Sequence, residues 1–568
     1  MRGNPVLLSI LNLGLLCLGD SARAQQTPDS PVSASCANEP LRTTGTTYYV
    51  CDCQGGADPS CVPGRDSNRG TKAAPWQSWT KALAQFKTMN GGDTIALCRG
   101  GAWNAVAGTC ANRAGNGMSQ SVTILNARCS ASSTCDWRDY DPAPVFRATA
   151  KPRIRPADGV ELFAFGRSRF NSSGYSASPI RGFRVFNLDL AANGNGTSSA
   201  FFVYGKAEDL EVCNVTIRDG FTNAYSAQTT STIKRVNFHH NRVTNNPFGI
   251  GPINSTSCAE DCTFDSNYMD LNGGATNRDH SIYVGASPDT PGQYDGMLTG
   301  TLGSYVRARR TRITNNEIHR SAHGAGNTCM GVAIVVHEPH DDLLIENNLI
   351  HEIPGAATPA CFGIQLSSGG NAPGSQARAI IRRNQIYNPG DKAIAVSECA
   401  DCVIEDNLIV AGPVTNTAIA YPEERYTSGP GSTPSGRGIV RNNTVYAPPG
   451  TRALEGGIKV NFASSSSASE GSGYQATHNA VCGGSAAVNV GPGVTYDRNW
   501  VGVNCSNWFT HPSSDPGIAD FTPVATSPLT GAGDPATSSR TAIGKVPWSP
   551  TDAGKPRGPA PDLGAYQR

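Results

Sequence analysis

A six-residue pattern with a central asparagine recurs along the chain and limits the folds that it can adopt. The pattern is apolar-x-x-Asn-x-apolar, and ITNNEI, IENNLI, IRRNQI and IEDNLI are four of its nine copies. The copies recur at irregular intervals along the chain, which is typical of a repeating coil that carries insertions of variable length. We expect each asparagine to take the left-handed backbone conformation at a sharp bend and to bond to the asparagines above and below. The set is Asn241, Asn267, Asn316, Asn348, Asn384, Asn407, Asn443, Asn479 and Asn499, with Asn187 and Asn214 in looser copies.

A second recurring segment lies between the asparagine segments and alternates in polarity, as in HSIYVG, VAIVVH, FGIQLS and KAIAVS. Alternation places the central apolar residue of each copy on one side of a strand. Short strands, tight turns and one inward apolar stack predict an all-β chain that folds as a parallel β-solenoid. The expected inward stack is Ile250, Ile282, Ile334, Ile364, Ile394, Ile419, Ile458 and Val488.

Helical periodicity is clearest in PWQSWTKALAQFKTM, at about residues 75–89. Pro75 suits the first turn of a helix, and Trp79, Leu83 and Phe86 fall on one face with Trp76. The open end of a solenoid requires a cover that is polar on its outer side. We therefore expect a short N-terminal capping helix.

The asparagine coils, the opening TYYVCDCQGG and GGDTIALCRGGAW, and the closing SPLTGAGDPA and APDLGAYQR give the chain a resemblance to a known group. It resembles secreted right-handed parallel β-helix proteins of the pectate-lyase-like superfamily. This resemblance implies a right-handed parallel β-helix that binds a glycan on the outer face of one sheet. The superfamily includes polysaccharide lyases, glycoside hydrolases, uronan epimerases and adhesins, so the resemblance does not select an activity.

The N-terminal residues predict export. A basic residue, an apolar run and an Ala-Arg-Ala triplet make residues 1–24 a secretory signal peptide that is cleaved before Gln25. We expect a linker over 25–45, the β-helix with its cap over 46–520, and a tail over 521–568 that closes the solenoid. The mature protein would be extracellular or periplasmic.

Composition limits the partners of the mature chain. A net charge of +1 and a charged fraction of only 16% argue against nucleic acid. No later segment has the 18 or more apolar residues of a membrane span, so membrane insertion is not expected. We expect a monomer that binds an acidic polysaccharide.

The chain has 18 cysteines, an abundance that fits an oxidising compartment and local disulfides. Four cysteines near the N-terminus, Cys36, Cys51, Cys53 and Cys61, would form two further bridges, and Cys213 would be free. The expected local pairs are Cys98 with Cys110, Cys129 with Cys135, Cys258 with Cys262, Cys329 with Cys361, Cys399 with Cys402, and Cys482 with Cys505.

Residues beside the inward stack should point outward and could form a flat binding face. One such column is small: Gly249, Ser281, Ala333, Gly363, Ala393, Ala418, Gly457 and Ala487. The next columns bring Tyr283, His337 and Gln365 onto neighbouring coils if these coils are successive, because rungs repeat at about 4.8 Å. Lys459 and Asn461 lie on the same face and are further candidates for substrate binding.

Eight of the ten histidines lie between His239 and His351, which marks this region for a site. His319 and His351 each follow a ladder asparagine by three residues and are expected to form an outward stack on another sheet. His280 has the parity of the inward stack, so it could be a structural histidine or a catalytic one. Arg320 is a candidate for holding a substrate carboxylate.

The segment HEPHD resembles the Asp-Pro-His-Asp motif of alginate C5-epimerases, although Glu338 stands for the first Asp and the Tyr expected upstream is absent. This likeness implies that His340 handles a proton, with Glu338 and Asp341 holding the uronate or its cation. A polar turn before a ladder strand is the alternative interpretation.

Carboxylates recur four residues after the inward stack. Glu398 and Glu423 are expected one coil apart and could share a cation such as calcium, although solvated turn charges are the alternative. Elimination from a uronate needs a base such as His or Tyr near C5, whereas hydrolysis needs two carboxylates. We predict a polysaccharide lyase acting on a uronate-containing glycan. A glycoside hydrolase, a uronan C5-epimerase and a non-catalytic glycan-binding protein are the alternatives.

Overall fold

The structure is a computed structural model that describes most of the chain between Cys36 and residue 567. Described are residues 36, 44–53, 61–107, 128–141, 150–166, 180–204, 206–227, 232–246, 251–274, 279–286, 307–323, 328–337, 339–367, 376–397, 399–422, 437–451, 454, 456–460, 472–483, 488–533, 541–544, 548–552, 554–557 and 561–567. The expected signal peptide lies outside these ranges.

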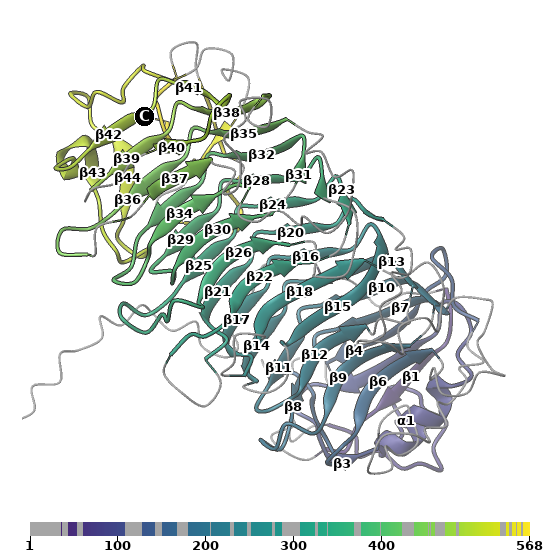
Figure 1. The fold of residues 1–568 in the computed structure, drawn as a ribbon. Helices are drawn as coiled ribbons and strands as arrows, with labels where there is room; N and C mark the ends of the chain where they lie inside the picture. The colour runs from purple at the N-terminus through teal and green to yellow at the C-terminus, as the bar shows by residue number, and fades with distance from the viewer. Residues whose placement is uncertain are drawn as a thin grey trace, which may run out of the picture.

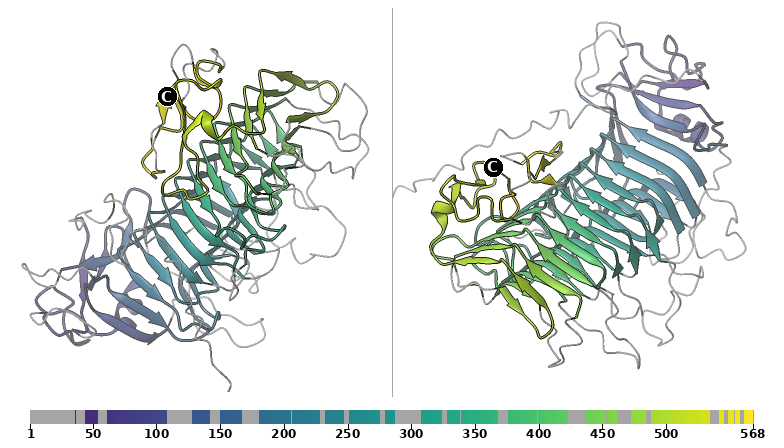
Figure 2. Two further views of the ribbon diagram at one scale, coloured as in Figure 1. Left: turned by 90° about the vertical axis from the view of Figure 1, so that its left-hand side faces the viewer. Right: turned by 90° about the horizontal axis from the view of Figure 1, so that it is seen from above.

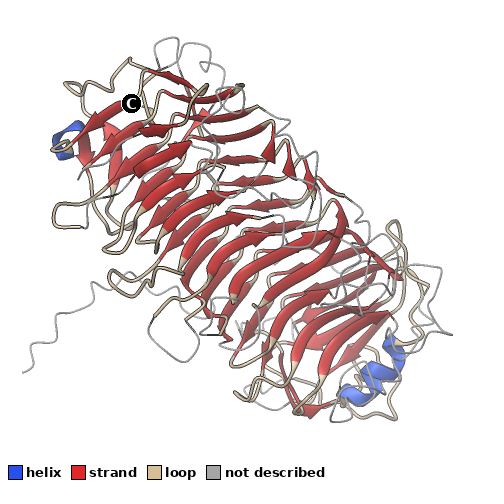
Figure 3. Ribbon diagram, viewed as in Figure 1, coloured by secondary structure: helices blue, strands red, loops and turns tan. Residues whose placement is uncertain are grey.

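The chain winds into an elongated right-handed parallel β-helix, as the sequence predicts (Figures 1 and 3). Each complete coil contributes a strand to three faces in turn, and every strand pairs with the strand of the next coil. The first and second faces are joined into one 29-stranded sheet, partly through short strands at the bend between them, and the third face is a separate 13-stranded sheet.

Strand bounds follow for each face. The first face contains β6 (Glu161–Gly166), β9 (Ser199–Tyr204), β12 (Asn223–Ala227), β15 (Ile253–Glu260), β18 (His280–Ala286), β22 (Val332–Val336), β26 (Phe362–Leu366), β30 (Lys392–Val396), β34 (Thr417–Ala420), β37 (Gly456–Val460) and β40 (Val488–Val490). The second face contains β1 (Thr47–Val50), β2 (Thr94–Cys98), β4 (Cys135–Tyr140), β7 (Ile180–Phe186), β10 (Lys206–Cys213), β13 (Thr232–His239), β16 (Thr263–Asp265), β20 (Arg312–Thr314), β24 (Leu344–Glu346), β28 (Ile380–Arg382), β32 (Cys402–Glu405), β35 (Gly438–Arg441), β38 (Tyr474–Thr477) and β41 (Thr495–Asp497). The bend strands are β19 (Ala308–Arg309), β23 (His340–Asp341), β27 (Gln376–Ala377) and β31 (Cys399–Ala400). The third face contains β3 (Ala102–Val106), β5 (Arg153–Pro156), β8 (Asp189–Ala191), β11 (Thr216–Arg218), β14 (Arg242–Asn246), β17 (Tyr268–Asn272), β21 (Glu317–Ser321), β25 (Leu349–His351), β29 (Gln385–Tyr387), β33 (Leu408–Val410), β36 (Thr444–Tyr446), β39 (Ala480–Cys482) and β42 (Trp500–Gly502).

The predicted apolar stack forms the centre of the core on the first face. Ile282, Ile334 and Ile364 pair in register and are fully buried, as are the later isoleucines of the stack. One position was predicted wrongly, because the residue that pairs with Ile282 from the preceding coil is Ile253 and not Ile250. Ile250 lies outside the described residues.

The column of small residues is not the floor of an outer groove. Ala333 and Ile334 are consecutive, yet both are fully buried in the same core cluster. A Cβ added to Gly363 would lie 3.0 Å from Cγ2 of Ile386, a core residue of the third face. Two successive residues near the start of β22, Ala333 and Ile334, therefore both point inward, and simple alternation fails there. The small residues allow the faces to approach closely at this corner.

The asparagine ladder is confirmed from Asn241 to Asn499. The Nδ2 group of each asparagine donates to Oδ1 of the next at 2.9 to 3.1 Å, and the backbone N–H donates to the same oxygen. The left-handed residue, however, is the one before each ladder asparagine, as at Asn315 and Asn347. Asn187 and Asn214 occupy that left-handed position and bond to each other beside the ladder.

A single α-helix occurs among the described residues, α1 (Trp79–Phe86), and it lies at the N-terminal end of the β-helix (Figure 1). Ser78 caps it, since its hydroxyl accepts the N–H of Lys81. Trp79 and Phe86 pack against Trp137 with ring centroids 4.9 and 5.3 Å apart. The predicted capping helix is thus confirmed, although it is shorter than expected. No helix in the described ranges is long and apolar enough to cross a membrane.

The described part of the C-terminal segment lies beside the coils of the third face (Figure 2). Its residues Phe509, Phe521 and Tyr566 share an apolar cluster with Tyr387 and Tyr446. An ion pair fixes it further, because Arg557 Nη2 lies 2.5 Å from the buried Asp406 Oδ1. The segment includes η3 (Ser506–Trp508), β43 (Phe509–His511), β44 (Asp520–Pro523), β45 (Thr541–Ala542) and β46 (Lys555–Pro556).

Eight disulfides are present among the described cysteines, which fits an oxidising compartment. Five expected local pairs are confirmed: 129–135, 258–262, 329–361, 399–402 and 482–505. Two expectations were wrong, because Cys98 pairs with Cys51 and Cys213 pairs with Cys36. Cys53 and Cys61 form the remaining bridge, and Cys110 lies outside the described residues.

Candidate functional site

Three rings form a row on the outer side of the first face, and we call His280, Tyr283 and His337 the ring row. His280 and Tyr283 belong to β18, and His337 directly follows β22, the strand of the next coil. The backbone N–H of His337 donates to Val284 at 2.9 Å, which continues the strand pairing. The parallel register thus brings together residues that are more than 50 positions apart in the sequence.

The rings of the row stack on one another. The centroids of His280 and Tyr283 are 5.6 Å apart, and those of Tyr283 and His337 are 5.0 Å apart, both with an interplanar angle of 28°. Nδ1 of His337 lies 2.8 Å from the Ser367 hydroxyl oxygen, which follows β26 on the next coil. This bond fixes the imidazole and leaves Nε2 as the atom that can act on a ligand.

Both imidazoles of the row are neutral near pH 7. Burial lowers the pKa of His337 to about 4. Burial and the neighbouring His337 lower the pKa of His280 to about 3. A neutral imidazole offers one donor and one acceptor nitrogen, so either ring could take a proton from a ligand. The alternation along the strand predicted that His280 points inward with Ile282. The ring of His280 instead stacks on that of the outward Tyr283.

The coils beyond the row add polar and cationic groups to the same face. Val335 pairs with Tyr283 on one side and with Gln365 on the other, so Gln365 lies in the same column as Tyr283. The side chain of Gln365 is half-buried. Nζ of Lys392 lies 5.1 Å from the ring centroid of Phe362, within cation–π range. The sequence placed Ser367 in the outward column of His337 without naming it as a site residue, and Lys392 was missed. The sequence could have indicated Lys392 by its position. It lies two residues before the inward Ile394, just as His280 lies two residues before the inward Ile282.

The described residues of the segment HEPHD lie in different surroundings. His340 is fully buried in the bend strand β23, where its backbone N–H donates to Gln376 Oε1 at 3.1 Å. Asp341 is held by Arg307, with the carboxylate oxygen 2.6 Å from Nη2. His340 is thus fully buried and does not join the ring row, and its expected proton-handling role stays a prediction. Glu338 lies outside the described residues.

The remaining candidate residues do not join the ring row. Arg320 lies in β21 on the third face, where its Nε donates to Asp270 at 2.7 Å, so it does not extend the row. The expected outward stack of His319 and His351 is confirmed on that face, with centroids 4.2 Å apart. Lys459 shares the column of Gln365 but lies three strands farther along. Asn461, Glu398 and Glu423 lie outside the described residues.

Comparison with known proteins supplies no family for the chain. No family model matches it, and no curated protein matches its sequence. Among solved structures, the lacto-N-biosidase of Eubacterium ramulus has a TM-score of 0.42 at 13% identity over 81% of this chain and 68% of its own. A pectate lyase has a TM-score of 0.40 at 13% identity over 94% and 100% of the two chains. The mannuronan C-5 epimerase module of Azotobacter vinelandii has a TM-score of 0.39 at 13% identity over 72% and 90%. At these values the similarity does not identify a reaction, and the fold rests on the strand pairing of the chain itself.

Proposed function

We propose that this protein is exported, binds an acidic polysaccharide along its first face, and cleaves the polysaccharide by β-elimination at the ring row. The single observation that carries this proposal is the stacked row of His280, Tyr283 and His337 on adjacent coils. The row places two neutral imidazoles and a phenol side by side, where their ring edges can exchange protons with a sugar residue.

The direction of the face suits an extended chain. Successive coils are separated by about 4.8 Å, close to the length of one sugar residue, so a polymer lying along the solenoid would meet one coil per residue. Gln365 can donate hydrogen bonds from its amide to a uronate carboxylate. The ammonium group of Lys392, which forms an ion pair with Asp391 at 3.2 Å, is a cation on the same face.

His337 is the proposed base, acting through Nε2. It takes the proton from C5 of the uronate, the electrons of that C–H bond form the C4–C5 double bond, and the bond from C4 to the glycosidic oxygen breaks. The Tyr283 hydroxyl supplies a proton to the departing oxygen. A bound uronate carboxylate would raise the pKa of His337 above its low value in the free protein and so make the imidazole a stronger base.

Calcium remains part of the proposal through Glu398 and Glu423. Carboxylate oxygens are the ligands that Ca²⁺ prefers, and a cation there would neutralise the uronate carboxylate and favour loss of the C5 proton. This contribution is tested by adding a chelator, and then excess Ca²⁺, to the same assay.

The experiment is incubation of the purified protein with pectate, alginate and glycosaminoglycans, followed by ultraviolet absorbance and product size. Elimination gives shorter chains with an unsaturated terminal residue that absorbs. New reducing ends without absorbance would replace the proposal by a hydrolase, and altered uronate composition at constant length would replace it by an epimerase. Retention of a polymer without any change would leave only a binding protein.

A further inference from the structure

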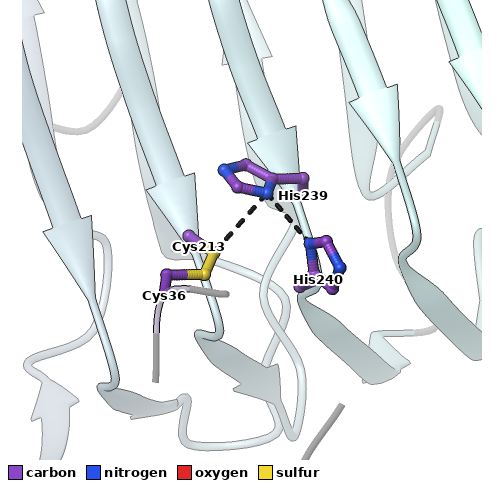
Figure 4. Close-up of side chains that lie close together, drawn as sticks. All are labelled: Cys36, Cys213, His239 and His240. Atoms are coloured by element: carbon purple, nitrogen blue, oxygen red, sulfur yellow. Dashed lines mark hydrogen bonds between the residues drawn. A yellow bond between two sulfur atoms is a disulfide. The ribbon is translucent and has the colours of Figure 1, made fainter. Parts of the chain in front are cut away.

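Four potential metal ligands converge where Cys36 meets the second face, and we call them the Cys–His cluster (Figure 4). The cluster consists of Cys36, Cys213 at the end of β10, His239 at the end of β13, and His240. One ligand atom from each residue lies within 4.8 Å of the other three. Cys213 and His239 are brought together because they pair in register on adjacent coils.

The orientation of His239 is set by a carboxylate. Its Nε2 lies 3.0 Å from Glu211 Oε1, so this nitrogen carries the proton and Nδ1 presents a lone pair to the cluster. Glu211 in turn lies 3.7 Å from the Arg184 guanidinium, which forms two hydrogen bonds to the buried Asp136. Such a histidine–carboxylate pair is the outer shell commonly found around metal-binding histidines.

Two distances within the cluster are close to those of a tetrahedral site, whereas the two sulfurs, which are bonded to each other here, would have to separate to about 3.8 Å. With Zn–S near 2.3 Å and Zn–N near 2.0 Å, sulfur and nitrogen ligands are separated by about 3.5 Å and two nitrogens by about 3.3 Å. The distance from Cys213 Sγ to His239 Nδ1 is 3.5 Å. The two Nδ1 atoms of His239 and His240 are 2.9 Å apart, so a metal ion would need them to separate by only a few tenths of an ångström.

We propose that the Cys–His cluster is a zinc site whose occupation alternates with the Cys36–Cys213 disulfide. In the oxidised form the two sulfurs are bonded to each other, and His240 donates a hydrogen bond to Nδ1 of His239. A dithiol reductant transfers two electrons and two protons to the disulfide, which gives two thiols and an oxidised dithiol. Zn²⁺ then binds two thiolates and two imidazole nitrogens, and the two thiol protons are released.

Both forms hold Cys36 against the same coil. The disulfide holds Cys36 by a covalent bond. The metal would hold it by coordination, and the affinity of the site for the metal depends on pH and is opposed by chelators. The cluster lies on the second face, so this inference does not depend on the function proposed for the first face.

The first test follows the wild-type chain during export. Cells are grown with and without added zinc, the protein is unfolded in chelator and alkylating reagent at harvest, and the peptides of Cys36 and Cys213 are mapped. We expect zinc to raise the alkylated fraction of both cysteines together, with one zinc per such chain in native mass spectra. A complete Cys36–Cys213 bridge under both conditions would overturn the proposal.

The second test isolates the other three ligands. In Cys36→Ser the disulfide cannot form, and the other bridges stay oxidised. We expect this variant to bind one Co²⁺, used as a spectroscopic substitute for zinc, with a thiolate-to-cobalt absorption band. Adding His239→Ala should abolish the band, and adding Glu211→Gln should weaken binding by roughly 10-fold or more. Adding His511→Ala, a change at an exposed histidine of the C-terminal segment, should have no effect. Absence of the band from Cys36→Ser itself would refute the site.

Discussion

Replacing one internal asparagine of the ladder should open the coils around it. Oδ1 of Asn384 accepts the backbone N–H of Asn348 at 3.0 Å and its Nδ2 at 2.9 Å. Nδ2 of Asn384 donates to Asn407 Oδ1 and to the carbonyl oxygen of Ile345, both at 3.0 Å. All three asparagines are fully buried, so water cannot replace these partners.

The Asn384→Ala variant leaves two buried donors on Asn348 without partners and removes one of the donors to the buried Ile345 carbonyl. Each orphaned group costs about 1 to 3 kcal/mol, and relaxation relieves part of this cost. We therefore expect the free energy of unfolding to fall by about 4 kcal/mol. Asn499→Ala is the matched control, because Asn499 occupies the last rung and is half-exposed. Water can reach the partners of Asn499 there, so we expect the free energy of unfolding to fall by only about 1 kcal/mol.

Hydrogen exchange followed by mass spectrometry measures this difference coil by coil, which suits a solenoid whose stability is local. Peptides that cover the strands next to Asn384 should exchange about a thousand times faster in Asn384→Ala than in the wild-type protein. In Asn499→Ala, faster exchange should be confined to the last coils. Equal acceleration in the two variants would refute the view that burial determines the strength of the ladder bonds.

Three further predictions concern the ring row and the C-terminal segment. On the polymer that shows elimination, His337→Ala and Tyr283→Phe should each lower the rate by roughly 100-fold or more with an unchanged circular dichroism spectrum, and full activity would move the site elsewhere. The folded-state pKa of His337 is about 4, below the unfolded value of about 6.5, so protonation favours the unfolded chain. The neutral His337 side chain should contribute up to about 3 kcal/mol to the free energy of unfolding. This contribution should be complete above pH 6.5 and should be lost as the pH falls towards 4. The His337→Gln variant should flatten this part of the plot of unfolding free energy against pH. Arg557→Met leaves Asp406 buried without its cation and should cost about 3 to 5 kcal/mol at pH 7, measured by limited proteolysis of the C-terminal segment. Burial raises the pKa of Asp406 to about 6, so the loss should be smaller at pH 5, and an equal loss at both pH values would contradict this assignment.

Features that recur in every coil could be predicted from the sequence. The ladder asparagines and the inward isoleucines repeat at equivalent positions, and each repeat supports the assignment of the others. Tyr283 and His337 were placed on neighbouring coils for the same reason. Disulfides between cysteines close in sequence were predicted because a short loop leaves few alternatives.

Features that depend on one coil, or on distant segments, could not be predicted in this way. His280 was misplaced because two successive inward residues interrupt the alternation at the start of β18. His340 was taken as a turn residue, although it lies in a two-residue strand at the bend and is fully buried. The bridge from Cys36 to Cys213 spans 177 positions, and no local spacing indicates a partner at such a distance.

The C-terminal segment also imposes an order of events on the folding of the chain. It covers Tyr387, Leu408 and Tyr446, but it is synthesised at least 60 residues after the last of them. During synthesis, the third face of these coils must therefore exist with an uncovered row of apolar side chains. A ribosome-bound or truncated chain that ends near residue 500 should bind chaperones or aggregate through this face, and addition of the missing segment as a separate peptide should suppress that association.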